Sequence, residues 1–405
     1  MELPQALTFD DVLLVPQESN VLPTAVDTVT RFSRNVPLNI PLASAAMDSV
    51  TESKLAISIA HEGGIGVVHR NLSIEDQVHQ VEMVKRSAHG VIRDPLTMTS
   101  SGTVGEARNL MQTHNISGLP IVDKEICVGI ITRRDLKFQG GDKQPVSEVM
   151  TRELVTAKPD TLLAQARKIL SSEKVEKLVL LDKNNSLAGL ITMRDIRLDR
   201  EYPQSAKDRE GCLLVGAAIG PHDYDRAEAL VAAGVDVLVI DTAHGHSENV
   251  INTVLELKKK DLVDVVAGNI CVKDAAEALI AAGADGVKVG IGPGSICTTR
   301  VVAGVGMPQF SAILQVSEFC NEHNVPVIAD GGIRHSGDAA KALAAGAECV
   351  MLGSLFAGVD ESPGESFLYN GRTFKAVRGM GSLTAMVEGG KARYGQDSID
   401  EQQKL

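Results

Sequence analysis

A loop between Lys288 and Arg300 carries the residues best suited to chemistry. It places three glycines within five residues and then Cys297, which has hydroxyl side chains on both sides. Glycines let another group approach the backbone closely, and a cysteine on such a loop can act as a nucleophile. The alternative is a tight strand-to-helix turn followed by a buried cysteine, because lone cysteines usually lie in protein cores. The composition of the loop leaves both possibilities open.

The elements that must position this loop alternate between strands and helices. From Leu213 onward, apolar runs alternate with helical stretches, and two similar runs with helices over residues 52–61 and from 73 to about 87 come earlier. The predicted strands are residues 40–47, 65–69, 213–219, 235–241, 264–269, 286–292, 326–331 and 349–354. Eight such units predict an α/β fold, a (β/α)8 TIM barrel, in preference to a doubly wound sheet. Residues 1–37 are predicted to be irregular.

A tandem repeat interrupts this alternation after the second predicted strand. Residues 129–135 recur as residues 189–195, at an offset of 60, and each copy follows a helix–strand–turn–strand–helix pattern. A pair of this size is typical of a self-contained module. The predicted division is a first barrel part, an inserted module of two copies and a second barrel part: residues 1–88, 89–200 (about 91–145 and 149–200) and 201–405.

Composition excludes several functional classes. The net charge of −12 argues against nucleic acid and anionic membranes as main partners, because both are bound through basic patches. The six cysteines lie far apart, which fits neither a disulfide framework nor a zinc site. No apolar run approaches the roughly 18 residues of a membrane span, and no leader-like segment is present at the start. We therefore predict a cytoplasmic protein.

Small and polar residues follow the predicted strands where a barrel enzyme carries its site. Barrel loops after strands 7 and 8 often bind phosphate, and here those strands are followed by 331–332 and by Gly353 and Ser354. Small residues with free N–H groups suit a phosphate, whereas Asp330 would repel one and suits a ribose diol. Strands 4 and 5 end at Asp241 and Asn269. These residues are expected to converge at one end of the barrel.

The loop at residues 290–300 resembles the signature of the IMP dehydrogenase and GMP reductase family. Residues 47–52 and 378–383 favour the dehydrogenase, and so does the repeat, which resembles a pair of cystathionine-β-synthase (CBS) motifs. The resemblance covers essentially the whole chain. It implies oxidation of IMP to XMP by NAD⁺ through a covalent cysteine thioimidate. It also implies a homotetramer, possibly an octamer, with ATP or GTP at the CBS module.

The resemblance implies a role for each residue of the predicted site. The catalytic set would be Cys297, Thr299, Arg393 and Tyr394. The NAD⁺ contacts would be Asp241, Thr242, Asn269, Gly290, Ile291 and Gly292. The IMP contacts would be Met47, Ser295, Asp330, Gly331, Gly332, Gly353, Ser354, Val377, Arg378, Gly379, Met380 and Gly381. Carbonyl groups would bind K⁺ at Gly292, Gly294 and Cys297. The regulatory nucleotide would contact Thr132, Asp135, Thr192 and Asp195.

Four points qualify this resemblance. Arg393 is implied as the general base for hydrolysis, but an arginine is normally always protonated, so the residue alone would suggest a phosphate or carboxylate clamp. The Thr-x-x-Asp pairs, of which Thr132 and Asp135 form the first, could equally cap the following helix. The family usually has tyrosine where this chain has Val377. The chain ends at Leu405, within the expected flap, and we therefore expect poor hydrolysis of the intermediate.

Three alternatives remain beside the dehydrogenase. The first is GMP reductase, which shares the fold and the cysteine but lacks the Arg393–Tyr394 pair implied here. The second is a nucleotide-sensing CBS protein whose barrel does not turn over. The third is a barrel aldolase or isomerase, which would need a lysine or carboxylate at the barrel centre and has little need of Cys297.

Overall fold

The chain folds into two compact units. The first comprises Met1–Lys85, Gln204–Asp208 and Leu213–Leu405, and the second comprises Arg86–Pro203 and Arg209–Cys212. The structure is a computed structural model that describes residues 5–87, 92, 95–114, 116–137 and 141–380. Within these ranges, every helix is too short or too polar to span a lipid bilayer.

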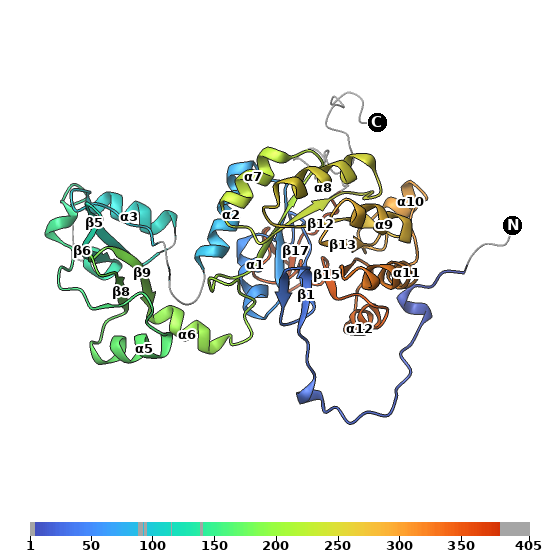
Figure 1. The fold of residues 1–405 in the computed structure, drawn as a ribbon, viewed down its shortest axis with the longest axis horizontal. Helices are drawn as coiled ribbons and strands as arrows, with labels where there is room; N and C mark the ends of the chain where they lie inside the picture. Colours follow the sequence, from blue (N-terminus) through green and yellow to red (C-terminus); the bar gives the residue numbers. More distant parts are fainter. Residues whose placement is uncertain (1–4, 88–91, 93–94, 115, 138–140, 381–405) are drawn as a thin grey trace. The chain divides into compact units, whose positions relative to one another are not determined.

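The first unit is a closed barrel of eight parallel strands (Figure 1). In the order in which they pair, the strands are β10 (Val215–Ile219), β11 (Val237–Asp241), β12 (Asp264–Ile270), β13 (Gly286–Val289), β14 (Val327–Asp330), β15 (Cys349–Leu352), β3 (Leu42–Ser44) and β4 (Ile65–Val68). The helices of this unit are α1 (Ser53–His61), α2 (Ile74–Arg86), α7 (Tyr224–Ala232), α8 (Glu248–Lys260), α9 (Lys273–Ala281), α10 (Thr299–Val302), α11 (Gln309–Glu322) and α12 (Ser336–Ala344). Closure confirms the predicted TIM barrel and excludes the doubly wound sheet.

Both faces of the barrel strands are buried, and each face has its own apolar cluster. In β11, Val237 and Val239 belong to the cluster inside the barrel, whereas Leu238 and Ile240 pack outward against the helices. Side chains of a strand alternate between its two faces, so the next inward position of β11 is Asp241. The inner layer therefore changes from apolar to polar at the C-terminal ends of the strands.

A hairpin at the other end of the barrel corrects the prediction for residues 1–37. β1 (Thr30–Ser33) and β2 (Val36–Leu38) pair antiparallel, so the prediction that this whole segment is irregular is wrong. Phe32 is fully buried and belongs to the inner apolar cluster. Three- and four-residue strands carry too few alternating positions to stand out in a sequence. Two 3-10 turns, η1 (Phe9–Asp11) and η2 (Pro23–Ala25), precede them.

The second unit holds the two copies of the repeat. The first copy contains α3 (Val104–Thr113), β5 (Gly118–Asp123), β6 (Ile126–Thr132) and α4 (Arg133–Lys137). The second copy contains β7 (Thr156–Ala157), α5 (Leu163–Ser172), β8 (Lys177–Leu181), β9 (Leu187–Thr192) and α6 (Met193–Glu201), and a 3-10 turn, η3 (Val146–Glu148), lies between the copies. In each copy the two longer strands pair antiparallel.

The two places where the chain leaves and rejoins the first unit lie close together. Lys85, at the end of α2, places its Nζ 2.9 Å from an oxygen of Asp208 and 2.8 Å from one of Asp236. Asp208 follows the second unit in the chain and Asp236 precedes β11. The end of α2, where the chain leaves the first unit, and the segment Gln204–Asp208, to which it returns, therefore lie within the length of one lysine side chain.

Deletion of residues 91–198 is expected to leave a folded barrel, because the ten residues that remain at the junction, 86–90 and 199–203, can bridge this short distance. Circular dichroism should show one cooperative thermal transition, and size-exclusion chromatography should show a homogeneous species. An aggregated product, or one without a transition, would contradict the independence of the first unit.

Candidate active site

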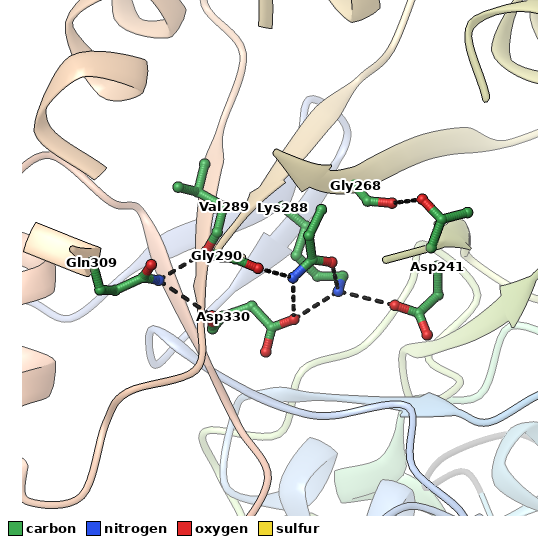
Figure 2. A network of polar contacts seen from close by, with 9 residues as sticks. Asp241, Gly268, Lys288, Val289, Gly290, Gln309 and Asp330 are labelled. Atoms are coloured by element: carbon green, nitrogen blue, oxygen red, sulfur yellow. Dashed lines mark hydrogen bonds and ion pairs between the residues drawn. The ribbon is translucent and has the colours of Figure 1, made fainter. Parts of the chain in front are cut away.

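Four polar side chains meet inside the C-terminal end of the barrel, at the ends of four neighbouring strands. Asp241 ends β11, Asn269 lies near the end of β12, Lys288 lies in β13 and Asp330 ends β14. The Lys288 Nζ lies 3.0 Å from an oxygen of Asp241 and 2.7 Å from one of Asp330, and it also donates to the Asn269 amide oxygen (Figure 2). Thr242 is buried beside them and donates to the Gly268 carbonyl at 2.6 Å. The expected convergence of Asp241, Asn269 and Asp330 is thus observed.

The sequence analysis missed Lys288, which is only 2% exposed. A detectable signal was present, because lysine is almost never fully buried unless it is paired, and here it lies within an otherwise apolar strand, Gly286–Val289. Val287 and Val289 pack outward, so alternation directs Lys288 into the barrel.

Cys297 lies on the loop that follows β13, two residues before the short helix α10 begins at Thr299. It is exposed, and its Sγ lies 3.2 Å from the Thr299 hydroxyl oxygen. Its backbone N–H donates to the Gly294 carbonyl at 3.0 Å. Exposure rules out the alternative of a buried core cysteine.

Loops from other strands lie against the cysteine loop. A side chain added at Gly331 would lie 3.1 Å from the Gly294 nitrogen, and one added at Gly379 would lie 3.0 Å from the Ile296 carbonyl oxygen. One added at Gly353 would lie 3.2 Å from the Met47 sulfur. The predicted IMP-contacting residues therefore come from segments that are adjacent in space. Those that the structure places around this end of the barrel are Met47, Ser295, Asp330, Gly331, Gly332, Gly353, Ser354, Val377, Arg378, Gly379 and Met380.

Arg378 is held by a carboxylate that the sequence analysis did not single out. Its Nε and one terminal nitrogen lie 3.0 Å and 2.6 Å from the same oxygen of Asp48. Asn71 donates to that oxygen at 2.8 Å. Asp48 and Asn71 follow β3 and β4, so this contact ties the segment that contains Val377 and Met380 to the start of the barrel.

Several predicted residues lie elsewhere. Gly381, Arg393 and Tyr394 are outside the described residues. Thr132 and Asp135 lie in the second unit, where one Asp135 oxygen accepts the Thr132 hydroxyl at 2.7 Å and the Thr132 N–H at 2.8 Å. These bonds match the helix-capping alternative. Thr192 ends β9, and the side chain of Asp195 is outside the described part.

Selective alkylation should separate Cys297 from the other five cysteines. Burial raises the pKa of the Cys320 thiol to about 12 and also raises the pKa of Cys127, Cys271 and Cys349. Because the thiolate is the reactive form, iodoacetamide at about pH 8 should modify Cys297 at least tenfold faster than the buried cysteines. Peptide mass spectrometry of briefly treated native protein measures this. Equal labelling of Cys297 and Cys320 would contradict it.

Comparison with known proteins gives a consistent result. Residues 6–405 match the family model described as "IMP dehydrogenase / GMP reductase domain". The chain is 57% identical over 398 residues to an inosine-5′-monophosphate dehydrogenase of Rhodopirellula baltica, a match that spans 97% of this chain and 74% of that protein. This chain belongs to the IMP dehydrogenase / GMP reductase family. It is therefore an enzyme of the oxidoreductase class.

Further relatives come from both branches of the family. An inosine-5′-monophosphate dehydrogenase of Methanocaldococcus jannaschii is 53% identical, with 98% of this chain and 81% of that protein covered. A crystal structure of GMP reductase from Trypanosoma brucei in complex with guanosine 5′-monophosphate aligns with a TM-score of 0.88 at 41% identity, covering 96% of this chain and 84% of that one. The barrel and its loops are thus shared across the family.

Proposed function

We propose that this chain oxidises IMP to XMP and reduces NAD⁺ to NADH. The observation that carries the proposal is an exposed Cys297 on the loop that follows β13, at the end of the barrel where Asp241, Lys288 and Asp330 meet, in a chain 57% identical to an IMP dehydrogenase. The cluster offers carboxylates for ribose hydroxyls, and the cysteine offers a nucleophile for the base.

The proposed reaction has two steps. The Cys297 thiolate adds to C2 of the hypoxanthine ring, and C2 then loses a hydride to NAD⁺, which is consumed as a second substrate. The product of this step is a thioimidate between Sγ and C2, together with NADH. Water then adds to C2, the C–S bond breaks, and XMP and the Cys297 thiol are released.

The chain's own residues position these groups. Asp330 accepts hydrogen bonds from the IMP ribose, while the backbone N–H groups of Gly332, Gly353 and Ser354 bind the phosphate. Asp241 and Asn269 hold the nicotinamide ribose. The Thr299 hydroxyl, 3.2 Å from Sγ, assists hydrolysis with Arg393 and Tyr394. K⁺ bound by the carbonyls of Gly292, Gly294 and Cys297 would keep the cysteine loop in its reactive shape.

Three further features belong to the same proposal. The two repeat copies act as CBS motifs that bind ATP or GTP through Thr132, Asp135, Thr192 and Asp195. The enzyme assembles as a homotetramer or octamer. A cytoplasmic location suits its six cysteines, which form no disulfide bond among the described residues.

The second candidate is GMP reductase, which is favoured by one specific observation: a solved structure of a GMP reductase aligns with this chain at a TM-score of 0.88. Sequence identity favours the dehydrogenase, at 57% and 53% against 41%.

Incubation of the protein with IMP, NAD⁺ and KCl tests the proposal by the absorbance of NADH. NADH formation that depends on IMP supports the dehydrogenase. Consumption of NADPH in the presence of GMP would instead identify the reductase, and inactivity in both assays with retained ATP or GTP binding would identify a sensor.

A further inference from the structure

Lys288 occupies the centre of the polar cluster and has no role in the proposed chemistry. Its ammonium group has three N–H donors, and the structure gives each of them one partner: Asp241 at 3.0 Å, Asp330 at 2.7 Å and the Asn269 amide oxygen (Figure 2). These partners end three different strands, on both sides of β13. One buried cation thus links the carboxylate proposed for the NAD⁺ ribose to the carboxylate proposed for the IMP ribose.

The contacts around Lys288 fix the orientation of its partners. Because the Asn269 oxygen faces the ammonium group, the Asn269 Nδ2 faces the other way and donates to Asp330 at 2.9 Å and to the Gly290 carbonyl at 2.7 Å. Oδ2 of Asp330 therefore accepts hydrogen bonds from both Lys288 and Asn269. Its Oδ1 makes no hydrogen bond to any described residue, and this oxygen can accept from a ligand hydroxyl.

The alternative role for a central lysine is that of an amine nucleophile, as a barrel aldolase would require. A nucleophilic amine needs a free lone pair and access to a carbonyl substrate. Lys288 is 2% exposed, and its three donors are directed at two carboxylates and an amide oxygen. With all three donors engaged and almost no exposed surface, the Lys288 amine is suited to positioning and not to covalent catalysis.

We infer that Lys288 is a positioning residue that orients Asp330 and Asp241 for the two ribose groups and so couples the IMP and NAD⁺ sites. The inference rests on the proposed function. Without the ammonium ion, two carboxylates would face each other inside the barrel with no compensating charge. The Asn269 amide would lose the contact that fixes its orientation, and Asp330 would rotate away from the diol.

The backbone is shaped to admit this lysine. A Cβ added at Gly268 would lie 2.7 Å from both the Cβ and the carbonyl oxygen of Lys288. Only glycine at this position of β12 lets the Lys288 side chain pass toward Asp241.

Ligands with and without the ribose diol test the inference in the full chain. Affinity is measured as protection of Cys297 from iodoacetamide by IMP and by 2′,3′-dideoxy-IMP. The unmodified protein should prefer IMP by at least about 50-fold, since the analogue leaves the Oδ1 atom of Asp330 without a hydrogen-bond donor. In Lys288→Met the preference should fall below about fivefold, and Lys288→Arg should restore part of it. In steady state, the KM for NAD⁺ should rise more than kcat falls.

A matched control separates positioning from general stability. Lys85 also bridges two carboxylates, Asp208 and Asp236, but at the opposite end of the barrel. Lys85→Met should keep the full preference for IMP over its dideoxy analogue. If Lys288→Met does not fold, Lys288→Gln, which keeps a donor and removes only the charge, should show the same loss of preference.

The outcomes distinguish the two proposals. An unmodified protein in which IMP does not protect Cys297 would overturn the proposed function and the inference together. If IMP protects Cys297 in the unmodified protein, and Lys288→Met and Lys288→Gln keep the same preference for IMP over the dideoxy analogue, the inference alone would be overturned. Equal weakening of both ligands would assign Lys288 a purely structural role and would also overturn it.

Discussion

Replacement of Cys297 by alanine should reduce NADH formation by at least about 10⁴-fold, because both proposed steps pass through the bond between Sγ and C2. The affinity for IMP should change by less than about threefold, since the ribose and phosphate contacts lie on other strands. Stopped-flow absorbance and equilibrium binding of IMP measure the two quantities. Activity within tenfold of the unmodified protein would refute the covalent role.

A second cysteine provides the matched control for this substitution. Cys271 directly follows β12, is half-buried and packs against the outer apolar cluster. Cys271→Ala should retain the NADH rate, which shows that loss of a thiol near this end of the barrel has no general effect. Loss of activity in both variants would point to a shared structural cause instead.

Replacement of Gly290 by alanine should distort the site through the backbone. Gly290 has φ +149°, and an added Cβ would lie 2.0 Å from the Asp330 carbonyl oxygen. Gln309 donates to that same oxygen at 3.2 Å and to the Val289 carbonyl at 2.9 Å, so the neighbouring chain has little freedom to move away. We expect roughly 3 kcal/mol of destabilisation from overpacking and backbone strain.

Loss of IMP binding should accompany this destabilisation, because a shift of Asp330 moves the carboxylate proposed for the ribose. Urea denaturation and protection of Cys297 by IMP measure the two effects. Gly337→Ala, the same change at a position of α12 with no atom within 4 Å of the added Cβ, should leave both unchanged or raise stability by up to about 1 kcal/mol. Unchanged stability and binding in Gly290→Ala would show that β13 and β14 can separate at no cost.

Local sequence patterns were sufficient to predict the architecture of the barrel. Runs such as Val237–Asp241 are apolar along most of their length because both faces of the strand are buried, and each run is followed by a helix. This pattern is a property of a few consecutive residues, so eight strands and their order could be counted directly. The glycine loop before Cys297 is equally local, and its resemblance to a known signature predicted the family. Short strands such as Val36–Leu38 escaped detection because three residues contain too little pattern.

Contacts between residues that are distant in the chain could be learned only from the tertiary structure. Lys288 is 47 residues from Asp241 and 42 from Asp330, and Arg378 is 330 residues from Asp48. Nothing in the sequence around one of these residues specifies the other. Whether Cys297 is buried or exposed was open for the same reason, because it depends on loops contributed by other strands. The sequence thus predicted the barrel correctly, and its resemblance to a known family proposed the reactive residues. The closure of the strands determined that a buried ammonium ion holds two of its carboxylates, because only closure brings the ends of β11, β13 and β14 into one low-dielectric interior where unpaired charges are unfavourable.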